Sequence, residues 1–295
     1  MERKDNERFW MVQRNRKNTK KEVVYCMKKR ESIRSWMYGV WIIVSALALA
    51  LSPIQTQAAD NDLDGFEEAG PTTLIGGAIY PMCQQGMDRA TCLDPATKDL
   101  FVILVPTTPS KFPQNPLEFI SNPNVSGGLG IGAHQIAANQ ADSARKVSSS
   151  STQKAIKITE SSDISKPDIL GTSNYGTPNG LDLATVYTLR IFNFIQSACG
   201  PGFLSNPNCL DSTGVWGQAL LDKYVKHTIA HEAGHMMKLT KTSDSRYGGY
   251  HYAPSAPEPL LTMAQSVTYV RDGSKVTFYL GTGFTSDDQI NAKMK

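Results

Sequence analysis

Three stretches of the chain have hydrophobic patterns that predict β-strands. Residues 99–106 form a continuous apolar run that ends at a proline, which is typical of a buried central strand. Residues 155–159 alternate between apolar and polar side chains, as a strand with one buried face does. Residues 266–279 carry β-rich runs on both sides of Asp272 and Gly273, which predicts a hairpin.

The most regular helical pattern covers residues 216–239. Apolar side chains recur there at helical spacing, at Leu221, Val225, Ile229 and Met236, and no proline interrupts them. The segment is apolar around much of its circumference, which is expected for a helix in the middle of a domain. We therefore expect a central, largely buried helix here.

Four other segments have weaker patterns. Residues 107–130 are rich in Pro, Asn, Ser and Gly, so we expect a loop. Residues 134–146 carry alanines and polar residues that fit a helix, and residues 171–180 are rich in turn-forming residues. Residues 184–197 are largely apolar, and their pattern fits either a strand or a helix.

The N-terminal part of the chain is typical of an export signal. Residues 37–52 form an uncharged apolar run of signal-peptide length, basic residues precede it, and the stretch 56–58 suits a cleavage site. Residues 1–58 are therefore interpreted as a basic N-terminal extension and a signal peptide, with Met27 as an alternative start. We expect a secreted, periplasmic or cell-surface protein, and an uncleaved segment acting as a membrane anchor is the alternative.

The positive charge of the chain is concentrated in this N-terminal segment. Residues 1–36 hold 12 Lys+Arg and 5 Asp+Glu, a net charge of +7, whereas the whole chain carries +3. The rest of the chain therefore carries −4. A basic surface for nucleic acid is not expected on the mature protein.

Four of the five cysteines follow the apolar run, and an even number in an exported chain favours disulfides. These cysteines are Cys83, Cys92, Cys199 and Cys209. Their short separations suggest the pairs 83–92 and 199–209, although four cysteines allow three pairings. A zinc site formed by cysteines is weakly supported, because neither pair has the C-x2-C spacing.

Residues 59–96 form an acidic, cysteine-containing segment that we expect to be separate from the main domain. Asp60, Asp62 and Asp64 stand at alternate positions before Gly65, an arrangement that can wrap oxygen ligands around a hard cation. The run resembles the first half of an EF-hand-type calcium loop, but a proline stands where that loop places its closing glutamate. A calcium site and a solvated acidic terminus are therefore both open.

The predicted central helix contains an HExxH motif, formed by His231, Glu232 and His235. Histidines four residues apart project from one face of a helix, so both imidazoles can bind a single zinc ion. Glu232 is offset around the helix and can reach a zinc-bound water, whose proton it would take as the water attacks a peptide carbonyl. The motif therefore predicts a catalytic zinc centre.

Zinc in such a site usually has a third protein ligand. His227 lies one turn before the motif on the same row, and three ligands in line on one helix do not surround a tetrahedral ion well. His134 lies far upstream and could line the cleft. His251 follows a glycine-rich loop after the helix, so we expect it to be the third ligand, with Glu258 and Asp244 as alternatives.

The stretch 231–263 resembles the metzincin clan of zinc peptidases, which includes the matrixins and astacins. The matching parts are the HExGH sequence in the helix, the downstream His251, and Met263, which would supply the clan's Met-turn beneath the metal. The clan's usual motif has a glycine three residues and a histidine six residues after the second histidine. This chain has Lys238 and Lys241 at those positions, so the resemblance leaves the subfamily open.

The resemblance implies an α/β (α+β), zincin-like catalytic domain over residues 97–295, with a mixed sheet and a central active-site helix. The implied function is that of an exported zinc-dependent endopeptidase, which cleaves protein or peptide substrates by a zinc-bound water that Glu232 activates. The alternative is a calcium-binding surface or adhesion module whose metal site is inactive or structural. A zinc hydrolase acting on a non-protein amide ranks third, because HExxH is characteristic of peptidases.

Overall fold

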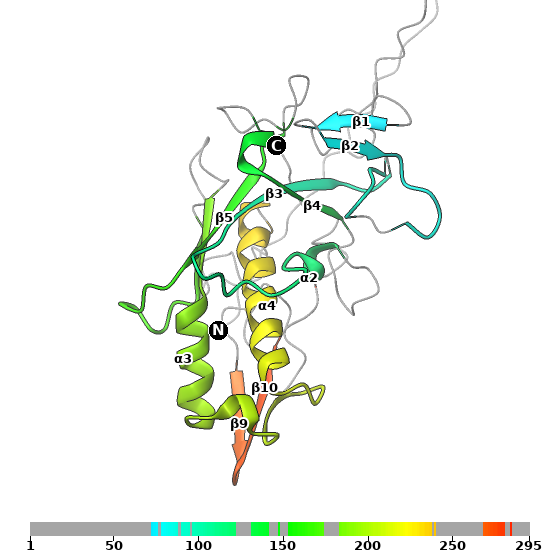
Figure 1. Ribbon diagram of the computed structural model, residues 1–295. Helices are drawn as coiled ribbons and strands as arrows, with labels where there is room; N and C mark the ends of the chain where they lie inside the picture. Colours follow the sequence, from blue (N-terminus) through cyan, green and yellow to red (C-terminus); the bar gives the residue numbers. More distant parts are fainter. Residues whose placement is uncertain are drawn as a thin grey trace, which may run out of the picture. The chain divides into compact units, whose positions relative to one another are not determined.

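A five-stranded mixed sheet forms the centre of the structure, which is a computed structural model (Figure 1). The structure describes residues 72–75, 78–87, 90–94, 96–121, 131–141, 147, 153–173, 183–237, 239, 268–280 and 284. All of them belong to one compact unit that spans residues 56–295. Mixed α/β structure is thus present, as expected. The predicted division of the chain at residues 96 and 97 stays a prediction.

The central sheet has the strand order β4-β3-β5-β7-β6. Its strands are β3 (Asp99–Val105), β4 (Gly132–Ile136), β5 (Ile156–Ser161), β6 (Gly171–Ser173) and β7 (Leu183–Tyr187). The pairs β3–β4, β3–β5 and β5–β7 are parallel, whereas β6 pairs antiparallel with β7. The short strand β6 therefore stands at one edge of the sheet and runs against the other four strands.

Both faces of strand β3 are buried. Leu100 and Val102 belong to the larger hydrophobic core, whereas Phe101 and Ile103 belong to a second hydrophobic cluster. Successive side chains of a strand point to opposite faces, so a strand that is covered on both faces needs a continuous apolar run. The prediction of a buried central strand over residues 99–106 is confirmed.

Two helices, α3 (Thr188–Cys199) and α4 (Gln218–Met236), lie side by side (Figure 1). Helix α4 also packs against β5, β6, β7 and the short helix α2 (Glu118–Ser121). Twelve of the 19 residues of α4 are buried, so the expectation of a largely buried helix within residues 216–239 is confirmed. Two 3₁₀ turns cover Ala138–Gln140 and Phe203–Ser205.

Two smaller sheets complete the described strands. Strands β1 (Thr72–Ile75) and β2 (Ala78–Pro81) form an antiparallel hairpin. The other sheet has the order β8-β10-β9, with strands β8 (Cys209–Asp211), β9 (Thr268–Asp272) and β10 (Lys275–Tyr279). Strand β10 is antiparallel to β9 and parallel to β8. The hairpin predicted around Asp272 and Gly273 is confirmed.

The structure differs from the sequence predictions in three segments. Residues 107–130 were predicted to be a loop, but they contain the short helix α2. Residues 134–146 were predicted to be helical, but they begin within strand β4 and continue into a 3₁₀ turn. Alanine favours helices, yet pairing with β3 buries Ala133 and Ile136, and this tertiary packing outweighs the local preference. Residues 171–180 were predicted to form turns, but they begin with β6, because the first three residues pair with β7.

The ambiguous segment 184–197 contains both kinds of structure. Strand β7 ends at Tyr187, and helix α3 begins at Thr188. The alternating strand predicted over residues 155–159 is confirmed as β5, whose residues alternate between buried and half-buried. The change from strand to helix at residue 188 explains why neither period fits the whole of the ambiguous segment.

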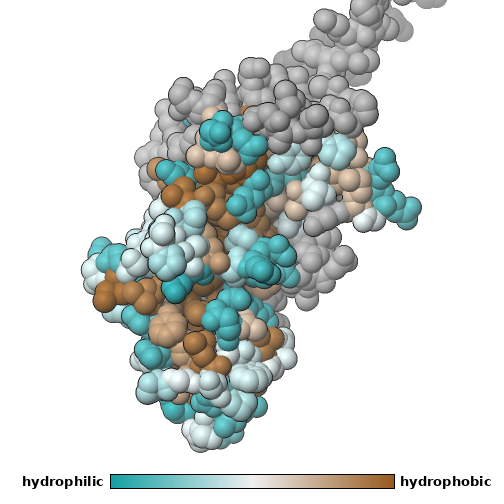
Figure 2. Space-filling model, viewed as in Figure 1, coloured by the Kyte–Doolittle hydropathy of each residue, from teal (hydrophilic) through white to brown (hydrophobic). Residues whose placement is uncertain are grey.

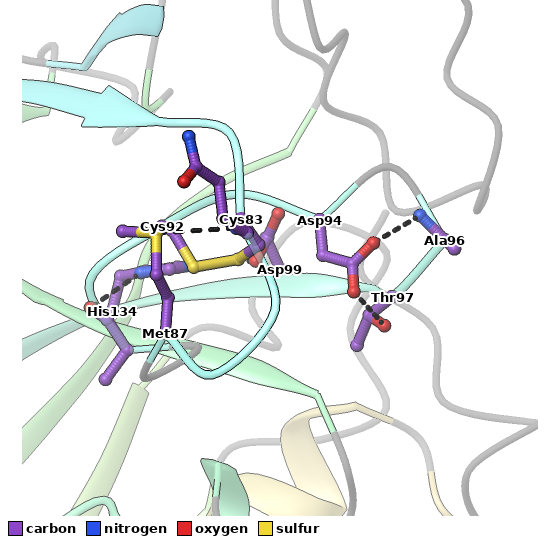
Figure 3. Close-up of a disulfide and its surroundings, with 10 residues drawn as sticks. Cys83, Met87, Cys92, Asp94, Ala96, Thr97, Asp99 and His134 are labelled. Carbon is purple, nitrogen blue, oxygen red and sulfur yellow. Dashed lines mark hydrogen bonds and ion pairs between the residues drawn. A yellow bond between two sulfur atoms is a disulfide. The ribbon is translucent and has the colours of Figure 1, made fainter. Parts of the chain in front are cut away.

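Two disulfides are present, Cys83–Cys92 and Cys199–Cys209, and these are the pairs that the short separations suggest. The first closes the loop that follows β2 (Figure 3). The second joins the C-terminal end of α3 to the start of β8. Disulfides indicate an extracellular or otherwise oxidising environment. In the described parts of the chain, no helix has the length and apolar character needed to cross a membrane.

A buried carboxylate, Glu160, ties the end of β5 to two other segments. Its oxygens accept hydrogen bonds from the backbone N–H groups of Thr107 (2.9 Å) and Lys111 (2.8 Å) and from the hydroxyls of Ser110 (3.1 Å) and Thr188 (2.9 Å). Burial alone would raise the pKa of Glu160, but these hydrogen bonds favour the charged form and lower the pKa below its ordinary value. The carboxylate therefore fixes both the loop after β3 and the first turn of α3.

We expect Glu160→Gln to lower the free energy of unfolding at pH 7 by about 1–3 kcal/mol, because an amide group would turn an N–H donor toward other donors. The folded pKa of Glu160 lies below the unfolded value of about 4.3. The charge therefore stabilises the protein above the unfolded pKa, and this contribution is lost as the pH falls through the folded pKa. Urea unfolding at pH 7 and pH 3 should show the difference between wild type and variant shrinking at the lower pH.

The matched control is Asp168→Asn, which neutralises an exposed carboxylate in the loop after β5. It should change the free energy of unfolding by less than about 0.5 kcal/mol at either pH. Equal effects of the two substitutions at pH 7 would show that the buried hydrogen bonds of Glu160 do not stabilise the fold.

Candidate metal centre

A second buried carboxylate fixes the N-terminal end of helix α4. Asp211, the last residue of β8, accepts a hydrogen bond from the N–H of Val215 (2.9 Å) and pairs with Lys223 in the second turn of α4. Burial would raise the pKa of Asp211, but Lys223 and the N–H donor lower it. Gly217 precedes the helix with a φ of 68°, and a Cβ there would come within 2.8 Å of the carbonyl oxygen of Leu204. Together these features determine where α4 begins.

His231 and His235 converge near the C-terminal end of α4. Their Nε2 atoms lie 3.1 Å apart, and their ring centroids lie 4.7 Å apart. Two imidazole nitrogens at about 2.0–2.1 Å from one tetrahedral zinc ion stand about 3.3 Å from each other, so the pair fits a shared ion. His235 is buried and His231 is half-buried. The two rings can therefore supply two of the ligands of a zinc centre.

The carboxylate of Glu232 lies against the edge strand β6. A Cβ added to Gly171 would come within 2.5 Å of Glu232 Oε1 and 2.8 Å of its Cγ, so a glycine is needed for this approach. Glu232 is 5 % exposed, and burial raises its pKa to about 8. The nearby Ser173 hydroxyl favours the charged form and opposes this rise, although it does not complete a hydrogen bond. The carboxylate is thus held between α4 and β6.

His227 stands on the same row of α4 but does not converge with the pair. Its ring centroid lies 6.3 Å from that of His231 and 6.4 Å from that of Tyr224, and its side chain is buried. The expectation that His227 is not a zinc ligand stays a prediction. His227 therefore packs beside His231, within the core around Tyr224.

Both ring nitrogens of His134 have partners on another part of the sheet. Its Nε2 lies 2.7 Å from Oδ1 of Asp99, and its Nδ1 lies 3.0 Å from the carbonyl oxygen of Ala90 (Figure 3). The ring stacks on Phe101, with 5.1 Å between the ring centroids. Burial raises the pKa of Asp99, and the hydrogen bond to His134 opposes that rise. His134 thus forms a buried polar pair beneath the first disulfide loop, and its nitrogens are engaged there.

Several residues predicted for metal sites lie outside the described residues. They are the third-ligand candidates His251, Asp244 and Glu258, the Met-turn residue Met263, and the calcium candidates Asp60, Asp62 and Asp64. Their roles stay predictions. Among the residues that the structure describes, no group of three or more His, Cys, Asp or Glu side chains could hold a metal ion.

The sequence analysis missed the contribution of β6 to the site. Gly171 and Ser173 lie in a stretch whose composition predicts turns, and neither residue belongs to a motif. Their contact with Glu232 arises because the edge of the sheet packs against α4. Local sequence carries no signal for such a contact, so only the tertiary structure reveals it.

No family model matches the chain, and neither a curated protein nor a solved structure matches it.

We expect Gly171→Ala to lower the free energy of unfolding by about 1–3 kcal/mol, because the added Cβ would overlap the carboxylate of Glu232 and force α4 and β6 apart. Thr172→Ala, at the exposed neighbouring position on β6, is the control and should change stability by less than about 0.5 kcal/mol. Urea unfolding of the purified variants measures both effects.

A double-mutant cycle identifies the atoms responsible. If the overlap is with the side chain of Glu232, Gly171→Ala should cost much less in a Glu232→Ala background, with a coupling of about 1 kcal/mol or more. An unchanged cost in that background would show that the strand resists the methyl group for another reason.

Proposed function

We propose that the protein is an exported, zinc-dependent endopeptidase. The observation that carries this proposal is the distance of 3.1 Å between the Nε2 atoms of His231 and His235. The buried Glu232 directly follows His231 in the sequence. Two neutral imidazoles and an acid–base carboxylate on one helix are the residue types that metal-assisted hydrolysis of an amide needs. Zinc is the proposed metal, because nitrogen ligands at this spacing suit its tetrahedral geometry.

In this proposal His231 and His235 bind the metal, which when present lowers the pKa of water to about 7 and polarises a carbonyl group. Glu232 in its ionised form takes a proton from the attacking water and then delivers it to the leaving nitrogen of the peptide. A zinc cation near the carboxylate would favour this ionised form and oppose the rise in pKa that burial causes. The products are a free carboxylate and a free amine. The close packing of the Glu232 side chain between α4 and Gly171 holds the carboxylate in one orientation for both proton transfers.

The edge strand β6 supports a polypeptide as the substrate. It pairs with β7 along one side, and no other described strand pairs with it. An extended peptide can add to such an edge through backbone hydrogen bonds, which would bring its amide groups beside Glu232. This mode of binding favours a peptidase over a hydrolase of non-protein amides, because it recognises the peptide backbone itself.

The zincin-like fold belongs to the same proposal. The metzincin resemblance implies a mixed sheet and a central active-site helix, and the packing of the mixed sheet against the HExxH helix supports this part of the proposal. His251 is the proposed third ligand, and Met263 the proposed Met-turn residue. Export by the N-terminal segment agrees with the oxidising environment that the two disulfides indicate.

We expect Glu232→Ala to retain about one zinc ion per chain and to lose about 10²- to 10⁴-fold in peptide hydrolysis, because the ligands remain while the acid–base group is gone. Metal analysis and cleavage of a fluorogenic peptide mixture measure the two quantities on the mature protein. Glu118→Ala removes a carboxylate that pairs with Lys226 of α4 (2.5 Å), so it serves as the matched control and should stay active. Full activity of the Glu232 variant would exclude the proposed mechanism.

We also expect His251→Ala to weaken zinc binding far more than His227→Ala does, because a ligand from outside the helix completes the tetrahedron. Competition with a chelator of known affinity gives the zinc dissociation constant of each variant. His231→Ala provides the reference for the loss of one ligand. A larger loss for His227→Ala than for His251→Ala would mean that the third ligand is assigned wrongly.

A further inference from the structure

A buried arginine forms hydrogen bonds with both ends of the loop that leads into β6. Arg190, in the first turn of α3, is 2 % exposed. Its Nε donates to the carbonyl oxygen of Asp163 (2.6 Å), and its guanidinium also pairs with the Asp163 carboxylate. The third contact goes to the carbonyl oxygen of Ile169 (2.9 Å). One side chain thus closes a loop of seven residues, which we name the clasped loop (residues 163–169).

This set of hydrogen bonds requires the planar guanidinium group of an arginine. The guanidinium lies over the ring of Tyr187, 3.7 Å from its centroid, and this stacking fixes the plane of the donors. The backbone N–H of Tyr187 donates to the carbonyl oxygen of Leu170 (2.9 Å), which continues the attachment to the residue before β6. A lysine could reach one of these acceptors but could not bind three of them in one plane.

Apolar packing does little to hold the clasped loop. Figure 2 shows apolar residues at the surface of the protruding loop after β5, and its large apolar side chains Ile164 and Ile169 are 56 % and 37 % exposed. Leu170, by contrast, packs against the core. The loop therefore depends on the contacts of Arg190 and on the turn in which the Asp163 carboxylate accepts from the N–H of Ser165 (2.9 Å).

The clasped loop ends two residues before Gly171, the residue that contacts Glu232. We propose that Arg190 is a positioning residue: by closing the loop, it holds β6 against Glu232 and keeps the edge of β6 in place for a peptide. This inference rests on the proposed peptidase function. Arg190 itself touches no reacting atom and acts only through the position of β6.

The test compares Arg190→Lys with Arg271→Lys in the full mature protein loaded with zinc. Arg271 of β9 is the matched control, because it also anchors α3, through the carbonyl oxygen of Ala198 at the other end of that helix. Peptide cleavage gives kcat and KM, thermal unfolding gives Tm, and zinc content is measured for each. Hydrogen exchange read by mass spectrometry follows the amides of residues 163–173.

For Arg190→Lys we expect kcat/KM to fall about 10- to 100-fold, with KM increased, while zinc content is unchanged. A mere loss of folded enzyme lowers kcat and leaves KM as it was, so the rise in KM separates positioning from stability. Exchange should become faster by about tenfold in residues 163–173 and stay unchanged in β5 and β7. Arg271→Lys should alter neither KM nor exchange in the clasped loop.

Wild-type exchange and wild-type kinetics in Arg190→Lys would overturn the inference, and so would a fall in kcat alone that Arg271→Lys reproduces. If the proposed function itself is wrong, the zinc-loaded wild-type protein will cleave no peptide, and this result distinguishes the two failures. In that case the exchange of residues 163–173 still decides whether Arg190 holds β6: faster exchange supports the clasp, and unchanged exchange overturns it.

Discussion

The close contact between Glu232 and Gly171 is the constraint on which the rest of the candidate site depends. The Glu232 side chain is 5 % exposed and lies so close to β6 that a Cβ at residue 171 would overlap it, whereas glycine leaves this space open. The contact fixes the spacing between helix α4 and the edge strand β6. The contacts that position α4 or β6 therefore also position the candidate site. They include the Asp211–Lys223 pair at the start of α4 and the contacts of Arg190 with the clasped loop.

Helix α4 brings an unusual number of polar side chains into the interior. His227, Glu232 and His235 are all buried, although apolar residues at these positions would cost less desolvation free energy. Such exceptions to ordinary core composition concentrate at functional sites. A cation that binds the folded state alone would offset part of this cost, because binding to the folded state raises its stability. The polar interior of α4 therefore agrees with a function for the helix beyond packing.

The sequence predicted those strands and helices whose buried side chains recur at a regular spacing along the chain. The apolar run of β3 reflects a strand covered on both faces, and α4 reflects a helix surrounded by the core. The predictions failed where tertiary contacts override composition, as in residues 134–146, whose alanines favour a helix although the segment begins within β4, and in β6, whose glycine favours a turn. Within the site, His231, Glu232 and His235 follow from one motif. Gly171 and Arg190 act through contacts with distant segments, and no local pattern predicts them.

A second pair of histidines in α4 can be compared with His231 and His235. His227 and His231 have the same separation of four residues, yet their ring centroids lie 6.3 Å apart, against 4.7 Å for His231 and His235. The helical repeat alone therefore does not bring imidazoles together, and the orientation of the side chains decides the distance. A hydrogen bond between the two Nε2 atoms also suits 3.1 Å when one of them carries a proton. Zinc would bind the same Nε2 lone pairs that take up a proton when imidazole becomes imidazolium, so metal binding at this pair should compete with protonation and weaken as the pH falls.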